Sequence, residues 1–91
     1  MSTSTENTVA SEEIQAELVR FVAGQTKTTV KTDLDLFGSG LVSSLFALQL
    51  VVHVETAFGV AVQGSDLKID NFRTIEAITA LVLRLRGDGH G

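Results

Sequence analysis

The chain has 91 residues, 44% of them hydrophobic, which is enough for one small domain with a modest core. It contains no cysteine, which excludes disulfides and thiolate metal sites, and we expect a reducing, cytoplasmic setting. Eleven acidic against seven basic residues give a net charge of −4, so we expect no nucleic-acid partner.

The N-terminal residues 1–10 are polar and lack the basic start and apolar centre of a signal peptide, so we expect a flexible tail. The first helix should follow, with Ser11 as its N-cap and Gly24 ending it in the left-handed conformation. Its apolar face is set by helical spacing: Ile14, Leu18, Phe21 and Val22. No apolar run approaches the roughly 20 residues that cross a bilayer, so no membrane association is expected.

The connection from Gly24 to Ser43 is longer than most loops in compact domains. Apolar residues are spaced through it as anchors: Val30, Leu34, Leu36, Phe37 and Leu41. We therefore expect an ordered loop that presents the residues following it.

A second helix is predicted from Ser44 to Phe58, with Ser43 as N-cap and Gly59 just past its end. Apolar residues cover most of its surface: Ala47, Leu50, Val51, Val54 and Phe58, extended by Leu45, Leu48 and Val52. Only a narrow polar wedge remains: Gln49, His53 and Thr56. Such a helix is either central to the core or contacts partners through its apolar edge.

The remainder predicts one short helical piece over residues 65–70 and a last helix over residues 74–86. Thr74 should cap that helix, and Arg84 and Arg86 suit its final turn. The fold class is therefore all-α, with three long helices and one short one. The folded domain should span residues 11–86, followed by a flexible tail over residues 87–91.

The positions of the candidate catalytic residues exclude a catalytic role. Ser44 and His53 would lie roughly 13–14 Å apart along one helix at 1.5 Å per residue, too far for a nucleophile and its base. His90 lies in a glycine-rich tail without fixed geometry. We predict no catalytic residue and no enzyme activity.

Ligand motifs fail as well. The segment Asp33 to Gly38 begins like a calcium loop, but Phe37 and Ser44 stand where oxygen ligands are required. Gly38 and Gly40 lack the third glycine and the strand of a dinucleotide site. We predict no metal site. Ser44 is suited to covalent modification; the alternative is that Ser43 and Ser44 only cap the helix.

A family resemblance covers residues 11–86. The residues that carry it are Leu36-Phe37 through Ser44-Leu45, Gln49-Leu50-Val51, Glu55, Phe58-Gly59-Val60, Asp66-Leu67, Asn71-Phe72 and Thr74-Ile75. The family that this pattern resembles is the acyl carrier proteins. The resemblance implies a four-helix bundle with a long loop between helices 1 and 2. It also implies that a phosphopantetheinyl transferase attaches 4′-phosphopantetheine from coenzyme A to Ser44. The thiol of that arm would hold an acyl or aminoacyl group that separate enzymes load.

Two departures from the family indicate a specialised carrier. Ser43 replaces the usual Asp before the modified serine, and Glu55 is the only acid of the second helix. The string from Ser44 to Val51 most resembles discrete polyketide and mixed polyketide–peptide carriers that hold methoxymalonyl, hydroxymalonyl or aminomalonyl extender units. This resemblance implies a polyketide synthase acyltransferase or ketosynthase as partner, and we expect a monomer.

Alternatives stay open, because the sequence does not identify the cargo. The chain could be an aminoacyl, D-alanyl or fatty-acid-type carrier, or a non-catalytic helical adaptor. The expected partner-recognition residues are Ser43, Leu45, Phe46, Leu48, Gln49, Val52 and Glu55. For Phe46, packing under the long loop is an equal alternative.

Overall fold

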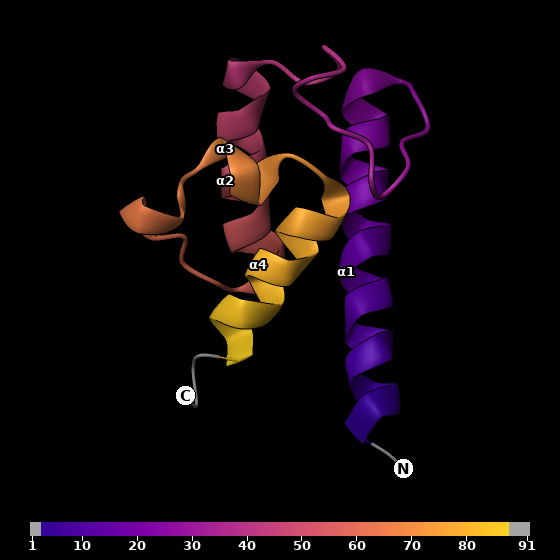
Figure 1. Cartoon of the computed structure of the whole chain (residues 1–91), viewed down its shortest axis with the longest axis vertical. Coiled ribbons are helices and arrows are strands. Elements are labelled where there is room, and N and C mark those ends of the chain that lie inside the picture. The colour runs from indigo at the N-terminus through magenta and orange to yellow at the C-terminus, as the bar shows by residue number, and fades with distance from the viewer. Residues whose placement is uncertain (1–2, 88–91) are drawn as a thin grey trace.

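The computed structural model describes residues 3–87, and over this range the chain is entirely helical and loop (Figure 1). It contains the helices α1 (Thr3–Thr26), α2 (Ser44–Phe58), α3 (Ile69–Phe72) and α4 (Ile75–Gly87), with a 3₁₀ turn, η1 (Gly64–Asp66). α4 packs against both α1 and α3, and in Figure 1 it crosses obliquely in the middle of the bundle. The predicted all-α, acyl-carrier-like four-helix bundle with a long first loop is confirmed.

The core draws apolar side chains from the helices and from the long loop. Its buried members are Ile14, Leu18, Val22, Val30, Leu36, Val42, Leu50, Val54, Phe72, Ile75, Ile78, Leu81 and Val82. Fully burying one such side chain contributes about 1.5–3 kcal/mol. The core therefore joins the loop to the helices as one packed unit.

The N-terminal limit of α1 differs from the prediction. The helix begins at Thr3, so the expected N-cap at Ser11 is wrong. Residues 3–10 contain no proline or glycine, so nothing in the local sequence interrupts the helix. In Figure 1 this end of α1 extends past the other helices. The flexible tail over residues 1–10 stays a prediction, because helix ends can fray.

The C-terminal limit of α1 also differs. The helix continues through Gly24 to Thr26, and the left-handed residue is Lys27, with φ 60°. The Lys27 N–H donates to the Ala23 carbonyl at 2.7 Å, and the Thr26 hydroxyl donates to the Val22 carbonyl at 2.8 Å. These bonds complete the last turn beyond Gly24, so the predicted end there is wrong.

The long loop is held against the start of α4, as its spaced apolar residues predict. Val30 and Leu36 are buried, and Val42 is a further buried anchor that the prediction omitted. The Leu36 N–H donates to the Arg73 carbonyl at 2.7 Å. The Glu76 N–H donates to the carbonyl of Thr32, which lies within the loop, at 2.9 Å. The loop thus approaches α2 from a fixed position.

The region between α2 and α4 contains two short elements, so the single piece predicted over residues 65–70 is wrong. The two elements are η1 and α3, and the side-chain amide of Asn71 in α3 donates to the Asp66 carbonyl in η1 at 2.8 Å. Phe72, the last residue of α3, is buried in the core, and α3 packs against α4. Thr74 caps α4 as predicted, because its hydroxyl accepts the Ala77 N–H at 2.9 Å.

The C-terminal prediction is tested only in part. Arg84 and Arg86 lie in the last turn of α4, as expected, and Gly87 is the last residue of that helix. Residues 88–91, including His90, lie outside the described residues. Among the helices of residues 3–87, none is long and apolar enough to cross a membrane.

Candidate functional site

Ser44 is the first residue of α2, and its neighbours fix that position. Ser43 is the N-cap, with extended backbone (φ −91°, ψ 170°), and its hydroxyl accepts the Phe46 N–H at 3.2 Å. Gly59, at φ 65°, ends the helix. The bounds and caps predicted for α2 are confirmed. Ser44 is exposed, and no hydrogen bond joins its hydroxyl to another residue within the described range.

The loop before Ser44 is organised around the carboxylate of Asp35. Its Oδ1 accepts the N–H groups of Gly38 at 2.8 Å and Phe37 at 3.2 Å, and its Oδ2 accepts from Arg73 Nη1 at 3.2 Å. The Gly38 N–H, followed by the Arg73 guanidinium, holds the pKa of Asp35 below its usual value. A Cβ added at Gly38 would lie 2.5 Å from the Asp35 Oδ2. Glycine is therefore required for this close approach.

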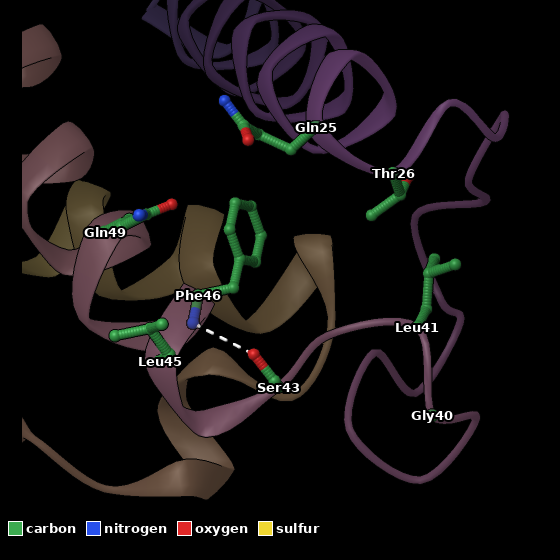
Figure 2. A pocket seen from close by; sticks show the side chains of 8 residues that line it. All are labelled: Gln25, Thr26, Gly40, Leu41, Ser43, Leu45, Phe46 and Gln49. Atoms are coloured by element: carbon green, nitrogen blue, oxygen red, sulfur yellow. Dashed lines mark hydrogen bonds between the residues drawn. The ribbon is translucent and has the colours of Figure 1, made fainter.

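Two hollows flank the start of α2. The larger one, about 440 Å³, is drawn in Figure 2 and is lined by Gln25, Thr26, Gly40, Leu41, Ser43, Leu45, Phe46 and Gln49. Its walls mix amide, hydroxyl and apolar groups and include no charged residue. The polar residues Gln25 and Gln49 come from different helices, α1 and α2 (Figure 2).

The smaller hollow, about 190 Å³, is almost wholly apolar. It is lined by Phe37, Ala47, Leu48, Val51, Leu67, Lys68, Ile69 and Phe72. Ala47, Leu48 and Val51 follow Ser44 by three, four and seven positions, which places them on its face of the helix. We call this hollow the serine-side slot.

Large apolar side chains are exposed next to the serine-side slot. Their exposed fractions are 69% for Leu45, 65% for Leu48, 60% for Val52, 52% for Leu67 and 58% for Ile69. We call these five residues the apolar surface. Apolar groups left in water at this density mark sites of protein or ligand contact.

Two of the expected recognition residues make internal contacts. The ring of Phe46 stacks on the ring of Phe21 in α1, with centroids 5.6 Å apart, so it packs between the helices. The Glu55 carboxylate accepts the Val62 N–H at 2.9 Å and holds the connection that follows α2. Their roles toward partners stay predictions.

His53 differs from its predicted place on a polar surface wedge. It is half-buried, its ring stacks on Phe21 at 3.9 Å, and its Nε2 lies 3.0 Å from the Glu17 Oε2. A hydrogen bond from Arg20 is the largest of the effects that lower the pKa of Glu17. His53 therefore joins α2 to α1. The sequence did not reveal this because both contacts lie on another helix.

The structure separates the expected recognition residues into groups. Ser43, Leu45, Phe46 and Gln49 line the larger hollow. Leu48 borders the serine-side slot, and Val52 continues the apolar surface one turn further along α2. Glu55 lies apart from both hollows. In the part of the chain that the structure describes, no cluster of three or more His, Asp or Glu side chains could hold a metal ion.

Fold and site together define a carrier domain: a helical bundle whose ordered loop delivers an exposed serine to a helix start. A family model, described as the phosphopantetheine attachment site, matches residues 16–82. The chain belongs to this family of phosphopantetheine-bearing acyl carrier proteins, and its prosthetic group is covalently attached 4′-phosphopantetheine.

The curated proteins to which the chain is similar are also named as carrier proteins. The chain is 29% identical over 66 residues to a D-alanyl carrier protein of Lactococcus lactis subsp. lactis (strain IL1403). It is 27% identical over 66 residues to the D-alanyl carrier protein of Lactococcus lactis subsp. cremoris (strain MG1363). Both alignments cover 72% of this chain and 84% of the relative.

The residues at the start of α2 fit such a group. α2 has 15 residues and no acidic side chain in its first turn, so its unpaired N–H groups and positive dipole end can face a phosphate. The exposed Ser44 hydroxyl leaves room for a bulky ester. When bound, the group supplies a thiol that holds acyl units as thioesters.

The Asp35 contacts predict a pH dependence of stability. Because folding lowers the pKa of Asp35, its contribution is present above its unfolded value of about 3.9 and is lost as the pH falls through the folded value. Asp35→Asn should lower the unfolding free energy at pH 7 and flatten its decline in acid. Urea unfolding followed by circular dichroism, from about pH 7 to pH 2, measures both.

Asp33→Asn is the matched control for that experiment, because Asp33 is an exposed acid of the same loop. It should keep the wild-type acid dependence. An Asp35→Asn protein with the wild-type slope would show that the Asp35 contacts do not couple protonation to folding.

Proposed function

We propose that Ser44 carries the phosphopantetheine arm and that this chain delivers an unusual acyl unit to a polyketide or mixed polyketide–peptide assembly line. The observation that carries the proposal is the exposed Ser44 hydroxyl at the first position of α2, which has no hydrogen-bond partner among residues 3–87 and follows a loop held by hydrogen bonds to Arg73 and Glu76. A rigid base with a free hydroxyl suits attachment of a long arm.

Attachment replaces the phosphoanhydride bond of coenzyme A with a phosphodiester bond to Ser44. A bond forms between the Ser44 oxygen and the phosphorus that bears the pantetheine portion of coenzyme A. The bond from that phosphorus to the rest of the nucleotide breaks, and adenosine 3′,5′-bisphosphate leaves. The serine proton passes to a base of the transferase. The chain contributes the position of the hydroxyl and the positive end of α2.

We infer that the chain performs no catalysis of its own. Ser44 and the one histidine of α2, His53, are nine positions apart, and His53 contacts Glu17 on α1. The base that activates Ser44 therefore has to come from the transferase. Loading and unloading of the thiol similarly belong to separate enzymes.

Carrier proteins of this family interact with a phosphopantetheinyl transferase and with loading enzymes, and we propose the apolar surface as their contact. Within α2 the sole acid, Glu55, is held by the Val62 N–H. A partner that docks here meets Leu45, Leu48 and Val52 in place of carboxylates. We therefore expect recognition by shape and apolar contact, with little electrostatic steering.

A second candidate function is carriage of an aminoacyl or D-alanyl unit, which the similarity to the Lactococcus D-alanyl carrier proteins favours. Both candidate functions use the same fold and the same attachment of the arm. They differ only in the cargo, because that is chosen by the loading enzyme.

Arm transfer tests the attachment residue. Incubation with coenzyme A and a promiscuous phosphopantetheinyl transferase should add the mass of one arm to the wild-type protein and none to Ser44→Ala. The control Ser43→Ala should still be modified, although loss of its cap costs about 1 kcal/mol of stability. Intact-protein mass spectrometry gives the result. A modified Ser44→Ala protein would refute the assignment, and a wild-type protein that never accepts the arm would favour an adaptor.

The Ser43 position predicts how transfer depends on salt. Ser43→Asp keeps an N-cap and adds negative charge at the positive end of α2, so stability should be kept or raised. With a basic transferase, kcat/KM should rise at low salt, and the gain should vanish near 1 M, where the Debye length is about 3 Å. The wild-type rate should change less over the same range. Equal salt dependence in both proteins would count against a missing recognition charge at Ser43.

The cargo can be read from the protein isolated from its native host. Mass spectrometry of the intact carrier should show the arm bearing a short, functionalised acyl unit. An arm bearing an ordinary long fatty acyl chain would contradict the extender-unit proposal, and an alanyl group would establish the second candidate.

A further inference from the structure

The serine-side slot has one charged residue in its wall. Lys68 precedes α3, and it borders a hollow whose other lining residues are all apolar. Its backbone carbonyl accepts the Asn71 N–H at 2.9 Å, which holds the backbone from which the side chain extends. A lysine placed in this way packs its methylene stem along apolar groups and keeps its ammonium in water at the rim.

The charge of Lys68 is not neutralised by its neighbours. The closest acids in sequence are engaged elsewhere: Asp66 pairs with Arg84 at 3.3 Å, and Asp70 pairs with Arg73 at 2.9 Å. Among the ion pairs of residues 3–87, none includes Lys68. The rim of the slot therefore carries an uncompensated positive charge.

The slot also lies on the face of α2 that carries Ser44. Leu48 follows Ser44 by one turn and Val51 by two, so a flexible arm on Ser44 can fold back along this face. The volume of about 190 Å³ is below the range of about 300–1,000 Å³ that holds drug-sized ligands. A slot of this size suits a short acyl group.

We propose that Lys68 is a specificity-determining residue, which recognises a free carboxylate on the acyl group from the rim of the serine-side slot; this inference rests on the proposed attachment of the arm to Ser44. The substrate class is the short dicarboxylic acyl thioesters, of which malonyl and its substituted forms are the simplest. Leu48 and Val51 line the slot, where the methylene carbon would lie, and Lys68 stands at the rim, where its ammonium would meet the carboxylate. An aminoacyl group would place an ammonium beside that same charge, so the slot disfavours it.

The expected effect is small but measurable. Exposed ion pairs shift an equilibrium by about two- to fivefold. A malonyl thioester that spends more time in the slot should therefore react more slowly with a thiol in solution, by about the same factor. High salt should remove the difference, because the ammonium lies in water.

The experiment compares three cargoes on the full chain. A promiscuous transferase loads malonyl, isovaleryl or β-alanyl phosphopantetheine from the corresponding acyl coenzyme A. Isovaleryl has the shape of malonyl without its charge, and β-alanyl carries a positive charge. Each loaded protein is exposed to a small thiol, and thioester loss is followed by mass spectrometry. The side-chain NMR signals of Lys68 are recorded in the same samples.

Lys68→Met keeps an unbranched apolar stem and removes the charge, and Lys31→Met is the matched control at an exposed lysine outside the slot. Lys68→Met should speed loss of the malonyl thioester about two- to fivefold, without speeding loss of the isovaleryl or β-alanyl thioester. Lys31→Met should change none of the three rates. Malonyl loading alone should shift the NMR signals of the Lys68 ε-methylene group.

Equal effects of Lys68→Met on malonyl and isovaleryl would overturn charge recognition, as would Lys68 signals that do not respond to malonyl. These outcomes are distinct from failure of the proposed function. The proposed function would fail in the arm-transfer experiment, where either the wild-type protein gains no arm or the Ser44→Ala protein still gains one.

Discussion

The attachment of the long loop to the junction of α3 and α4 is the constraint on which the rest of the structure depends. Arg73 serves this junction twice, because its carbonyl accepts the Leu36 N–H and its guanidinium donates to the Asp35 carboxylate. Burial of Leu36 seals the contact. Through it, a segment without regular structure reaches Ser43 in one conformation, and α2 starts at a fixed place.

This constraint makes the backbone around Ser44 the rigid base of the site. The Ser44 hydroxyl is exposed and unengaged within the described range, while the chain on both sides of it is held by capping and packing. The two hollows beside it differ in chemistry: one mixes polar and apolar groups without a charge, and the other is apolar with Lys68 at its rim. An arm carried by Ser44, as proposed, would therefore be within reach of walls of different polarity.

Charge is distributed unusually for a carrier that must meet several enzymes. The carboxylate of α2 is used internally by Glu55, and the acids near α3 are paired with Arg73 and Arg84. The large side chains exposed beside the slot are apolar, and among the described residues that line it Lys68 is the one with a charge. Under the proposed function, selection of partners and cargo rests on the apolar surface and on Lys68, since Glu55, Asp66 and Asp70 have structural partners.

The sequence by itself determined the features that depend on neighbours along the chain. The limits of α2, the caps at Ser43, Gly59 and Thr74, and the apolar residues of the core follow from capping chemistry and helical spacing. Only the tertiary structure decided the stacking of His53 on Phe21, the division of residues 64–72 into two short elements, and the slot beside Ser44. The stacking and the slot are made by groups distant in sequence, and α3 depends on the burial of Phe72 in the shared core, so no local periodicity encodes these features.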